Sequence, residues 1–453
     1  MNNQINQNQE LSSVLKQQYD NLPYPQIPIE KSPDGLYNSL FIHNLVTSYY
    51  LYKQQIIDTN NQIILDAGCG SGWKSLVLAK ANPGVKVVGI DLSPESVKIA
   101  QHRLNYHGYN NAEFYAIEIE QLGQLGYQFD YINCDEVIYL LPSPLEGLQA
   151  LKSVLKPDGI IRINFHSYYQ RFHFLKAQKL FQLMGLFESN PEEMEVEIVL
   201  ETMQSLKDKT DLKKNTWLNN FSSFNLGSDK CQESVLMNYL LQGDKAYTIP
   251  EIFQLLGQTE LEFLSMVNWR HWNVRELFND QDNLPAIWEM GLENISVEES
   301  LHIYELLNPV HRLIDFWCVN AQSSPDTIQP LSTWTREDWQ KSKVYLHPQL
   351  KCAKIKEDLI NSLKNQQSFV ISTYIPLPTI NSVELETNVA ACLLNLWEGE
   401  KTMAELVDFW LKIQPLDLIT CQPLTEKQAW HQVIKTIIKL ENFLYVLVEK
   451  SAK

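Results

Sequence analysis

A short glycine-rich segment constrains the fold of this chain more than any other feature of its sequence. It runs Leu65-Asp-Ala-Gly-Cys-Gly-Ser-Gly72 and continues an apolar stretch that is typical of a buried strand. Glycines at alternate positions let the backbone turn sharply and approach a ligand closely, which side chains would prevent. A helix is predicted to follow, with its N-terminus pointing toward the same place. The segment therefore predicts a strand, loop and helix arranged around a bound ligand.

The sequence around this loop alternates between strand-like and helix-like stretches. Several of the strand-like stretches are apolar along almost their whole length, as burial on both faces of a sheet requires. The expected strands are 63–67, 86–90, 113–117, 129–134 and 160–165, and the expected helices are 74–81, 94–105 and 145–155. This alternation predicts a Rossmann-like α/β fold: a mostly parallel sheet with helices on both faces. Two later strands, 261–267 and 314–320, are expected to complete the sheet, with room for one antiparallel member.

A chain of 453 residues exceeds what one hydrophobic core usually serves, so we expect more than one structured region. The most linker-like interior segment is Ala321-Gln-Ser-Ser-Pro-Asp326, and we place the main boundary there. Residues 1–40 are expected to form a polar, disordered tip followed by an N-terminal cap, and 41–322 the main domain with a helical insertion at about 166–260. Residues 327–453 are expected to form a smaller, mainly helical domain that is similar to a winged helix.

Composition excludes several classes of function. The net charge of −17 works against sequence-independent binding of a phosphate backbone, so nucleic acid is a disfavoured partner. Seven cysteines at wide spacings, without a Cys-x-x-Cys pair, indicate reduced thiols and no metal site. No apolar run is long enough to cross a bilayer, and the first residues lack the pattern of a signal peptide. We therefore expect a cytoplasmic protein without membrane insertion.

The residue after the glycine loop distinguishes between two kinds of cofactor. A dinucleotide site requires Gly-x-Gly-x-x-Gly, but Trp73 follows Gly72, so the third glycine of that pattern is missing. The second strand ends in Asp91, a carboxylate placed to accept both hydroxyls of an adenosine ribose. The third strand ends in Glu118, where an adenine amino group needs an acceptor. Together these acids predict an adenosine ligand other than a dinucleotide.

With these residues, the chain from 19 to 320 resembles the class I S-adenosylmethionine-dependent methyltransferases. The resemblance implies S-adenosyl-L-methionine as cofactor, bound on the glycine loop and the ends of the first four strands. It extends to Tyr19-x-x-x-Pro23-Tyr-Pro25, which is similar to an entry segment that covers the cofactor in some bacterial members. The implied cofactor-binding residues are Tyr19, Asp66, Gly68, Cys69, Gly70, Gly72, Asp91, Leu92, Glu118, Ile119 and Asn133. Family members more often have Gly-Asp at the positions of Ile117 and Glu118.

Three polar residues are candidates for catalysis. Asp135 and Glu136 follow the fourth strand, whose end faces the transferred methyl group in the family, and His166 follows the fifth. Each also has an ordinary structural interpretation: either acid serves equally as a helix cap or a solvated side chain, and His166 as a turn residue. Methyl transfer is an in-line displacement from an activated sulfonium, so the protein supplies mainly alignment and desolvation. A fixed catalytic triad is not required.

The methyl acceptor is less clearly indicated than the cofactor. Methylases of DNA amino groups commonly have Asp/Asn-Pro-Pro-Tyr after the fourth strand, whereas this chain has Asn133-Cys-Asp-Glu136. This difference favours a protein side chain or a small molecule as acceptor, and nearby carboxylates slightly favour nitrogen. The charge after residue 326 is nearly balanced, which fits contact with a protein partner better than with DNA. The alternative hypothesis is a non-catalytic protein that binds S-adenosylmethionine as a regulator or scaffold.

Overall fold

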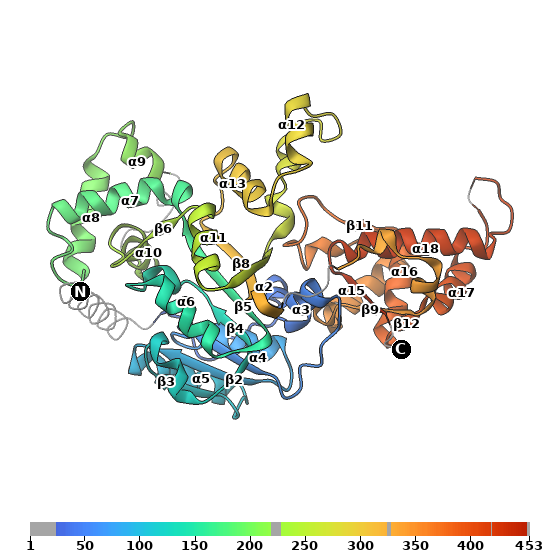
Figure 1. The fold of residues 1–453 in the computed structure, drawn as a ribbon, viewed down its shortest axis with the longest axis horizontal. Coiled ribbons are helices and arrows are strands. Elements are labelled where there is room, and N and C mark those ends of the chain that lie inside the picture. Colours follow the sequence, from blue (N-terminus) through green and yellow to red (C-terminus); the bar gives the residue numbers. More distant parts are fainter. Residues whose placement is uncertain (1–23, 219–227, 324–327, 418, 451–453) are drawn as a thin grey trace.

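The computed structural model describes residues 24–218, 228–323, 328–417 and 419–450 (Figure 1). Two of the predictions above, the disordered tip at 1–10 and the cofactor contact of Tyr19, lie outside these ranges. The described chain contains one large sheet covered by helices, a helical insertion, and a C-terminal unit with a small sheet of its own.

The large sheet has eight strands in the order β3-β2-β1-β4-β5-β8-β7, with β6 pairing beside β5. Its strands are β1 Ile63–Ala67, β2 Lys86–Asp91, β3 Glu113–Ala116, β4 Phe129–Cys134, β5 Leu155–Ser167, β6 Ala246–Tyr247, β7 Leu261–Met266 and β8 Leu313–Asn320. The five neighbouring strands β3, β2, β1, β4 and β5 are parallel to one another. Strand β8 runs antiparallel to both of its neighbours, β5 and β7. The predicted Rossmann-like sheet with one antiparallel member is confirmed.

Helices cover both faces of this sheet. On one face α6 Pro144–Ser153, α11 Ile249–Gln258 and α13 Val297–Leu307 pack over a continuous apolar core. On the other face α4 Trp73–Ala81 and α5 Pro94–Tyr106 pack with residues of α3 Leu45–Lys53. Sequence signals fix the starts of α5 and α6, because Ser93 and Ser143 accept a backbone N–H as N-caps and a proline follows each of them.

The predicted helical insertion follows β5. It contains α7 Tyr168–Leu183, α8 Glu193–Ser205, α9 Asp211–Thr216 and α10 Asp229–Tyr239. These helices share a separate apolar cluster that includes Phe181, Met203 and Tyr239. In Figure 1 they lie together at one end of the molecule, in green, beside β6. A second excursion, between β7 and β8, contains α12 Ala286–Leu292 and α13.

The C-terminal unit contains more regular structure than the sequence indicates. The helices expected over 327–453 include α16 Thr387–Asn395, α17 Met403–Ile413 and α18 Glu426–Glu441, and the chain continues into a strand, β13 Val446–Lys450. In addition, β9 Ser342–Leu346 pairs antiparallel with β12 Lys401–Thr402 and β13, and β10 Phe369–Val370 pairs with β11 Glu384–Leu385. The unit also contains the helices α14 Arg336–Gln340 and α15 Ala353–Lys364.

The segment before the sheet joins the two regions. The sequence predicts one helix over 40–55, but the structure has α2 Tyr37–Ile42 and α3, because Asn44 breaks the helix and caps α3 through its side chain. Phe41, Val46 and Tyr50 pack into the C-terminal core, whereas the opposite side of α3 packs onto the sheet. Figure 1 shows both helices between the sheet and the C-terminal unit. The two regions therefore share one buried element.

No helix in the described ranges is long and apolar enough to cross a membrane. None of the seven cysteines, all of which lie in the described ranges, is paired in a disulfide.

Candidate active site

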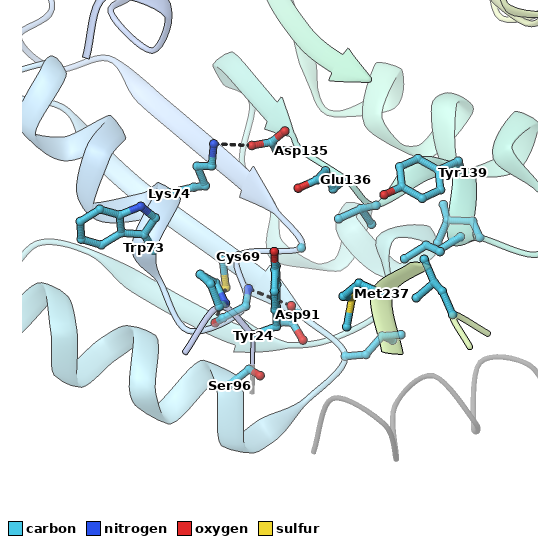
Figure 2. A pocket seen from close by; sticks show the side chains of 18 of the residues that line it. Tyr24, Cys69, Trp73, Lys74, Asp91, Ser96, Asp135, Glu136, Tyr139 and Met237 are labelled. Carbon is cyan, nitrogen blue, oxygen red and sulfur yellow. Dashed lines mark hydrogen bonds and ion pairs between the residues drawn. The ribbon is translucent and has the colours of Figure 1, made fainter. Parts of the chain in front are cut away.

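A cavity of about 590 Å³ opens at the carboxyl ends of β1, β2, β4 and β5. Its walls come from the segment before α2, the glycine loop, the ends of β2 and β4, helix α10 of the insertion, and Arg312 before β8. This is the edge of a parallel sheet where ligands are usually bound. Its volume lies in the range of cofactor sites. Figure 2 shows Asp135, Glu136 and Tyr139 along one side of the pocket, and Tyr24, Asp91 and Ser96 on the other.

The glycine loop forms the floor of the cavity. The N–H groups of Gly68 and Cys69 both donate to the carbonyl of Ile90, at 2.8 and 2.9 Å, which ties the loop to the end of β2. Gly70 has a φ of +50°, and a Cβ placed on it would lie 2.2 Å from the carbonyl oxygen of Tyr24. A side chain at this position is therefore excluded both by backbone conformation and by space.

The N-terminal segment packs directly onto this loop. Ser71 donates from its N–H to the Tyr24 carbonyl at 2.9 Å and from its hydroxyl to the Pro25 carbonyl at 2.7 Å. Arg103 of α5 joins the two by donating to the carbonyl of Ile27 in the segment and to that of Ser71 in the loop. The Tyr24 side chain lines the cavity, where burial and then the charge of Glu136 raise its pKa to about 12. Residues 19–23 of the predicted covering segment lie outside the described ranges, so the cover over the cofactor stays a prediction.

Asp91 stands at the end of β2 and faces the glycine loop. Its carboxylate accepts from the N–H of Gly70 at 2.9 Å and from that of Ser93 at 2.9 Å, and it lines the cavity (Figure 2). Nearby, the hydroxyl of Ser96 is buried, lines the same cavity and has no hydrogen-bond partner among the described residues. Burying a hydroxyl without a partner is costly, so this atom indicates a polar ligand. Sequence reasoning missed Ser96, which looks like an ordinary first-turn residue of α5.

Three of the predicted cofactor residues lie behind the cavity wall instead of lining it. Asp66 accepts from the Ser75 hydroxyl at 2.5 Å and from the Asn133 amide at 2.8 Å, and the amide oxygen of Asn133 accepts in turn from Arg162. Burial raises the pKa of Asp66 to about 6 in spite of these hydrogen bonds. Gly72 begins α4 and packs against the backbone of Ala100. These residues shape the loop, and direct contacts from them remain a prediction.

The remaining cofactor candidates line the cavity. Leu92, Glu118 and Ile119 form part of its wall, together with Cys69 of the loop. Glu120 lies beside them, and burial, followed by the charge of Glu118, raises its pKa above the usual value.

Asp135 lines the cavity but is held by strong partners. It forms an ion pair with Lys74 at 2.7 Å, accepts from the Asn164 amide at 2.5 Å and lies 3.6 Å from the Arg162 guanidinium. Burial favours the neutral acid, but the charges of Arg162 and Lys74 outweigh it and keep the pKa of Asp135 well below its usual range. Such a carboxylate is a poor proton acceptor at neutral pH. The structure therefore does not favour Asp135 as a catalytic base.

Glu136, the next residue, has a left-handed backbone with a φ of +60°. Its N–H donates to the Asn164 side chain at 2.8 Å, which holds this conformation. Non-glycine residues rarely adopt this backbone, and such residues cluster at functional sites. Its carboxylate forms an ion pair with Arg312 and lines the cavity.

His166 lies at the end of β5 on the same wall. Its ring stacks on Tyr139 with centroids 4.0 Å apart, its Nδ1 lies 2.7 Å from Asp244, and its Nε2 lies 3.0 Å from Arg312. The structure thus brings His166 and Glu136 together through Arg312. Sequence reasoning missed Tyr139, Arg312 and Asp244, because they belong to three distant segments and form no local motif.

These features fit S-adenosylmethionine. A Cβ on Gly68 or Gly70 would collide with a neighbouring residue, so both positions require glycine. Asp91 and the unpartnered Ser96 hydroxyl face one part of the cavity, and Glu118 lies on the wall beyond. A metal is not indicated, since no group of three or more His, Cys, Asp or Glu side chains in the described ranges has the geometry to bind one.

Comparison with known proteins supports the same reading. Residues 58–254 match the model of a methyltransferase domain family. An uncharacterised protein of Synechococcus sp. is 25% identical over 333 residues, which cover 73% of this chain and 74% of that protein. A ubiquinone biosynthesis O-methyltransferase of Actinobacillus pleuropneumoniae is 29% identical over 133 residues, which cover 28% of this chain and 56% of that enzyme. The shared part with the second relative is therefore little more than half of its length.

Among solved structures, PKMT2 from Rickettsia typhi has a similar fold. The TM-score is 0.59 at 15% sequence identity, and the match covers 94% of this chain and 77% of that protein. The complex of the same protein with AdoHcy aligns with a TM-score of 0.57. At this identity the likeness concerns the fold, and it includes the C-terminal unit as well as the large sheet.

Proposed function

We propose that this chain, an S-adenosylmethionine-dependent methyltransferase, transfers the methyl group to an amine nitrogen of a protein side chain or a small molecule. The observation that carries the proposal is the charge of the cavity wall. Six carboxylates line the cavity against three cationic side chains. Two of the carboxylates, Asp91 and Glu118, belong to the part assigned below to the cofactor, which leaves four carboxylates against three cations. Two of those cations, Lys74 and Arg312, pair with wall carboxylates. A wall of this charge favours a cationic acceptor over an anionic one.

The cofactor supplies a methyl group on a sulfonium, and the protein aligns the acceptor with it and excludes water. We assign the ribose to Asp91 and Ser96, the adenine to Glu118, Ile119 and Leu92, and the methionyl part to the loop at Gly68, Cys69 and Gly70. The acceptor would enter on the other side, between α10 and the wall of Glu136, Tyr139 and His166. Asp66, Gly72 and Asn133 support the loop from behind.

We also propose a separate role for each region of the chain. Residues 41–322 would form the catalytic domain, with the insertion at about 166–260 contributing α10 to the acceptor side. Residues 327–453 would contact a protein partner. Because α2 and α3 pack against the C-terminal core as well as the large sheet, they would hold that partner in a fixed position relative to the cavity.

The experiment is to incubate the full chain with radiolabelled S-adenosylmethionine and a cell extract, and to separate macromolecules from small molecules. If the acceptor is an amine, the product is stable to base, and prior acetylation of amines in the extract abolishes labelling. Base-labile label, or label that acetylation does not reduce, would contradict nitrogen transfer. Asp91→Ala, which is expected to bind the cofactor more weakly, serves as the control with reduced labelling at low cofactor concentration.

A further inference from the structure

A buried aspartate holds the histidine of the acceptor wall in one orientation. Asp244, whose side chain is 0% exposed, lies 2.7 Å from the Nδ1 of His166 and also accepts from Arg171 at 2.6 Å and Gln178 at 2.8 Å. Burial opposes its ionisation, but the hydrogen bond to His166 and the charge of Arg171 outweigh burial and lower the pKa of Asp244 to about 2. An ionised carboxylate only accepts hydrogen bonds, so Nδ1 of His166 carries the proton.

The other ring nitrogen faces Arg312, a residue of the cavity wall. Nε2 of His166 lies 3.0 Å from a guanidinium nitrogen of Arg312, which can only donate, so Nε2 has a lone pair. His166, Tyr139 and Arg312 all line the cavity. Burial, and the charges of Arg171 and Arg312, lower the pKa of His166 in spite of the opposing charge of Asp244. The imidazole is therefore neutral and able to accept a proton.

Arg312 also contacts the acid of the acceptor wall. Its guanidinium bridges Nε2 of His166 and the carboxylate of Glu136, and its side chain is 44% exposed. A cationic acceptor that reaches Glu136 competes with Arg312 for the same carboxylate. Because an exposed ion pair is weak, exchange of one cation for another there costs little.

We propose that His166 is the base that takes the proton from the acceptor amine, that Asp244 positions it, and that Arg312 covers it until the acceptor occupies Glu136. This proposal rests on the proposed amine acceptor. The groups that face the imidazole are Asp244 and Arg171 from the insertion, Arg312 and Glu136 from the cavity, and Tyr139 across the ring.

The chemistry requires a base because an alkylammonium has no lone pair, and its pKa is about 10.4 in water. The N–H bond of the ammonium breaks, its proton moves to Nε2 of His166, and the electron pair stays on the acceptor nitrogen. The resulting imidazolium is stabilised by the carboxylate of Asp244. The nitrogen becomes cationic again on methylation, and the proton on His166 passes to solvent when the product leaves.

The first test observes the tautomer without an activity assay. Histidine ¹⁵N spectra of the full chain with bound S-adenosylhomocysteine, assigned with His166→Gln, should show protonated Nδ1 and unprotonated Nε2 at pH 7. Asp244→Asn should shift the ring away from this tautomer. A wild-type ring protonated at Nε2, or at both nitrogens, would overturn the proposal.

The second test is the pH profile of methyl transfer to extract proteins. His166→Gln should lower kcat by about 10²- to 10⁴-fold at pH 7, with unchanged affinity for S-adenosylhomocysteine, and its rate should keep rising with pH as the acceptor loses its proton to solvent. The exposed His102→Gln serves as the matched control. A His166→Gln rate equal to that of the wild type refutes the relay alone, whereas a wild type that labels no amine refutes the proposed acceptor and the relay with it.

Discussion

Replacing Gly70 by alanine tests whether the contact between the glycine loop and the N-terminal segment shapes the cofactor site. The added Cβ meets the Tyr24 carbonyl oxygen at 2.2 Å, so the segment must move and the 2.9 Å bond from Ser71 to that carbonyl is lost. The φ of +50° costs an alanine about 1–2 kcal/mol, and the lost hydrogen bond adds about 0.5–1.5 kcal/mol. If all of this cost falls on the cofactor-bound state, the dissociation constant rises roughly 10- to 300-fold.

The assay is calorimetric titration with S-adenosylhomocysteine, combined with urea unfolding of the free protein. Gly108→Ala is the matched control, because Gly108 has a φ of +83° but no atom within 4 Å of the added Cβ. It should lose stability through backbone strain and bind the ligand as the wild type does. Wild-type affinity in Gly70→Ala would refute the argument that this contact shapes the site.

Three further predictions concern single side chains. Ser96→Ala should weaken binding of S-adenosylhomocysteine by about 3- to 10-fold with no loss of stability, because the hydroxyl has no protein partner to lose; unchanged affinity would remove Ser96 from the site. The pKa of Asp66 in the folded state, about 6, lies above its ordinary 3.8, so the folded state binds this proton more tightly than the unfolded state. The free energy of unfolding therefore falls as pH rises from about 4 to 6, by on the order of 3 kcal/mol. Asp66→Asn should abolish that part of the pH dependence. Tyr50→Phe removes the hydroxyl that donates to Glu441 and accepts from the Val448 N–H, two bonds that join the two regions. The free energy of unfolding should fall by about 1–3 kcal/mol, whereas the exposed control Tyr106→Phe should leave it unchanged.

Local motifs carried most of what could be predicted from the sequence. The glycine loop and Asp91 lie where their spacing placed them, because a parallel strand, a tight turn and a helix are specified by neighbouring residues. Strand β8 could also be predicted, because its residues are mostly apolar. Asp135 was placed correctly on the wall, but its pairing with Lys74 and Arg162 depends on packing that no local pattern reports.

The acceptor wall shows where sequence reasoning stops. Tyr139, Arg312 and Asp244 meet at His166 only because β8 returns antiparallel beside β5 and the insertion folds back onto the sheet. Asn44, which caps α3 locally, is likewise held by a bond from its amide to the carbonyl of Ala81, a residue 37 positions later. Such contacts between distant segments leave no periodic or spaced signal in the chain.

The most direct test of the central claim, that the loop and Asp91 hold an adenosine-linked sulfonium, is calorimetric titration of wild type and Asp91→Ala with S-adenosylhomocysteine. We expect a dissociation constant in the micromolar range for the wild type and for the exposed Glu95→Ala control, and roughly 10- to 100-fold weaker binding for Asp91→Ala. Equal affinity in Asp91→Ala and Glu95→Ala would contradict it.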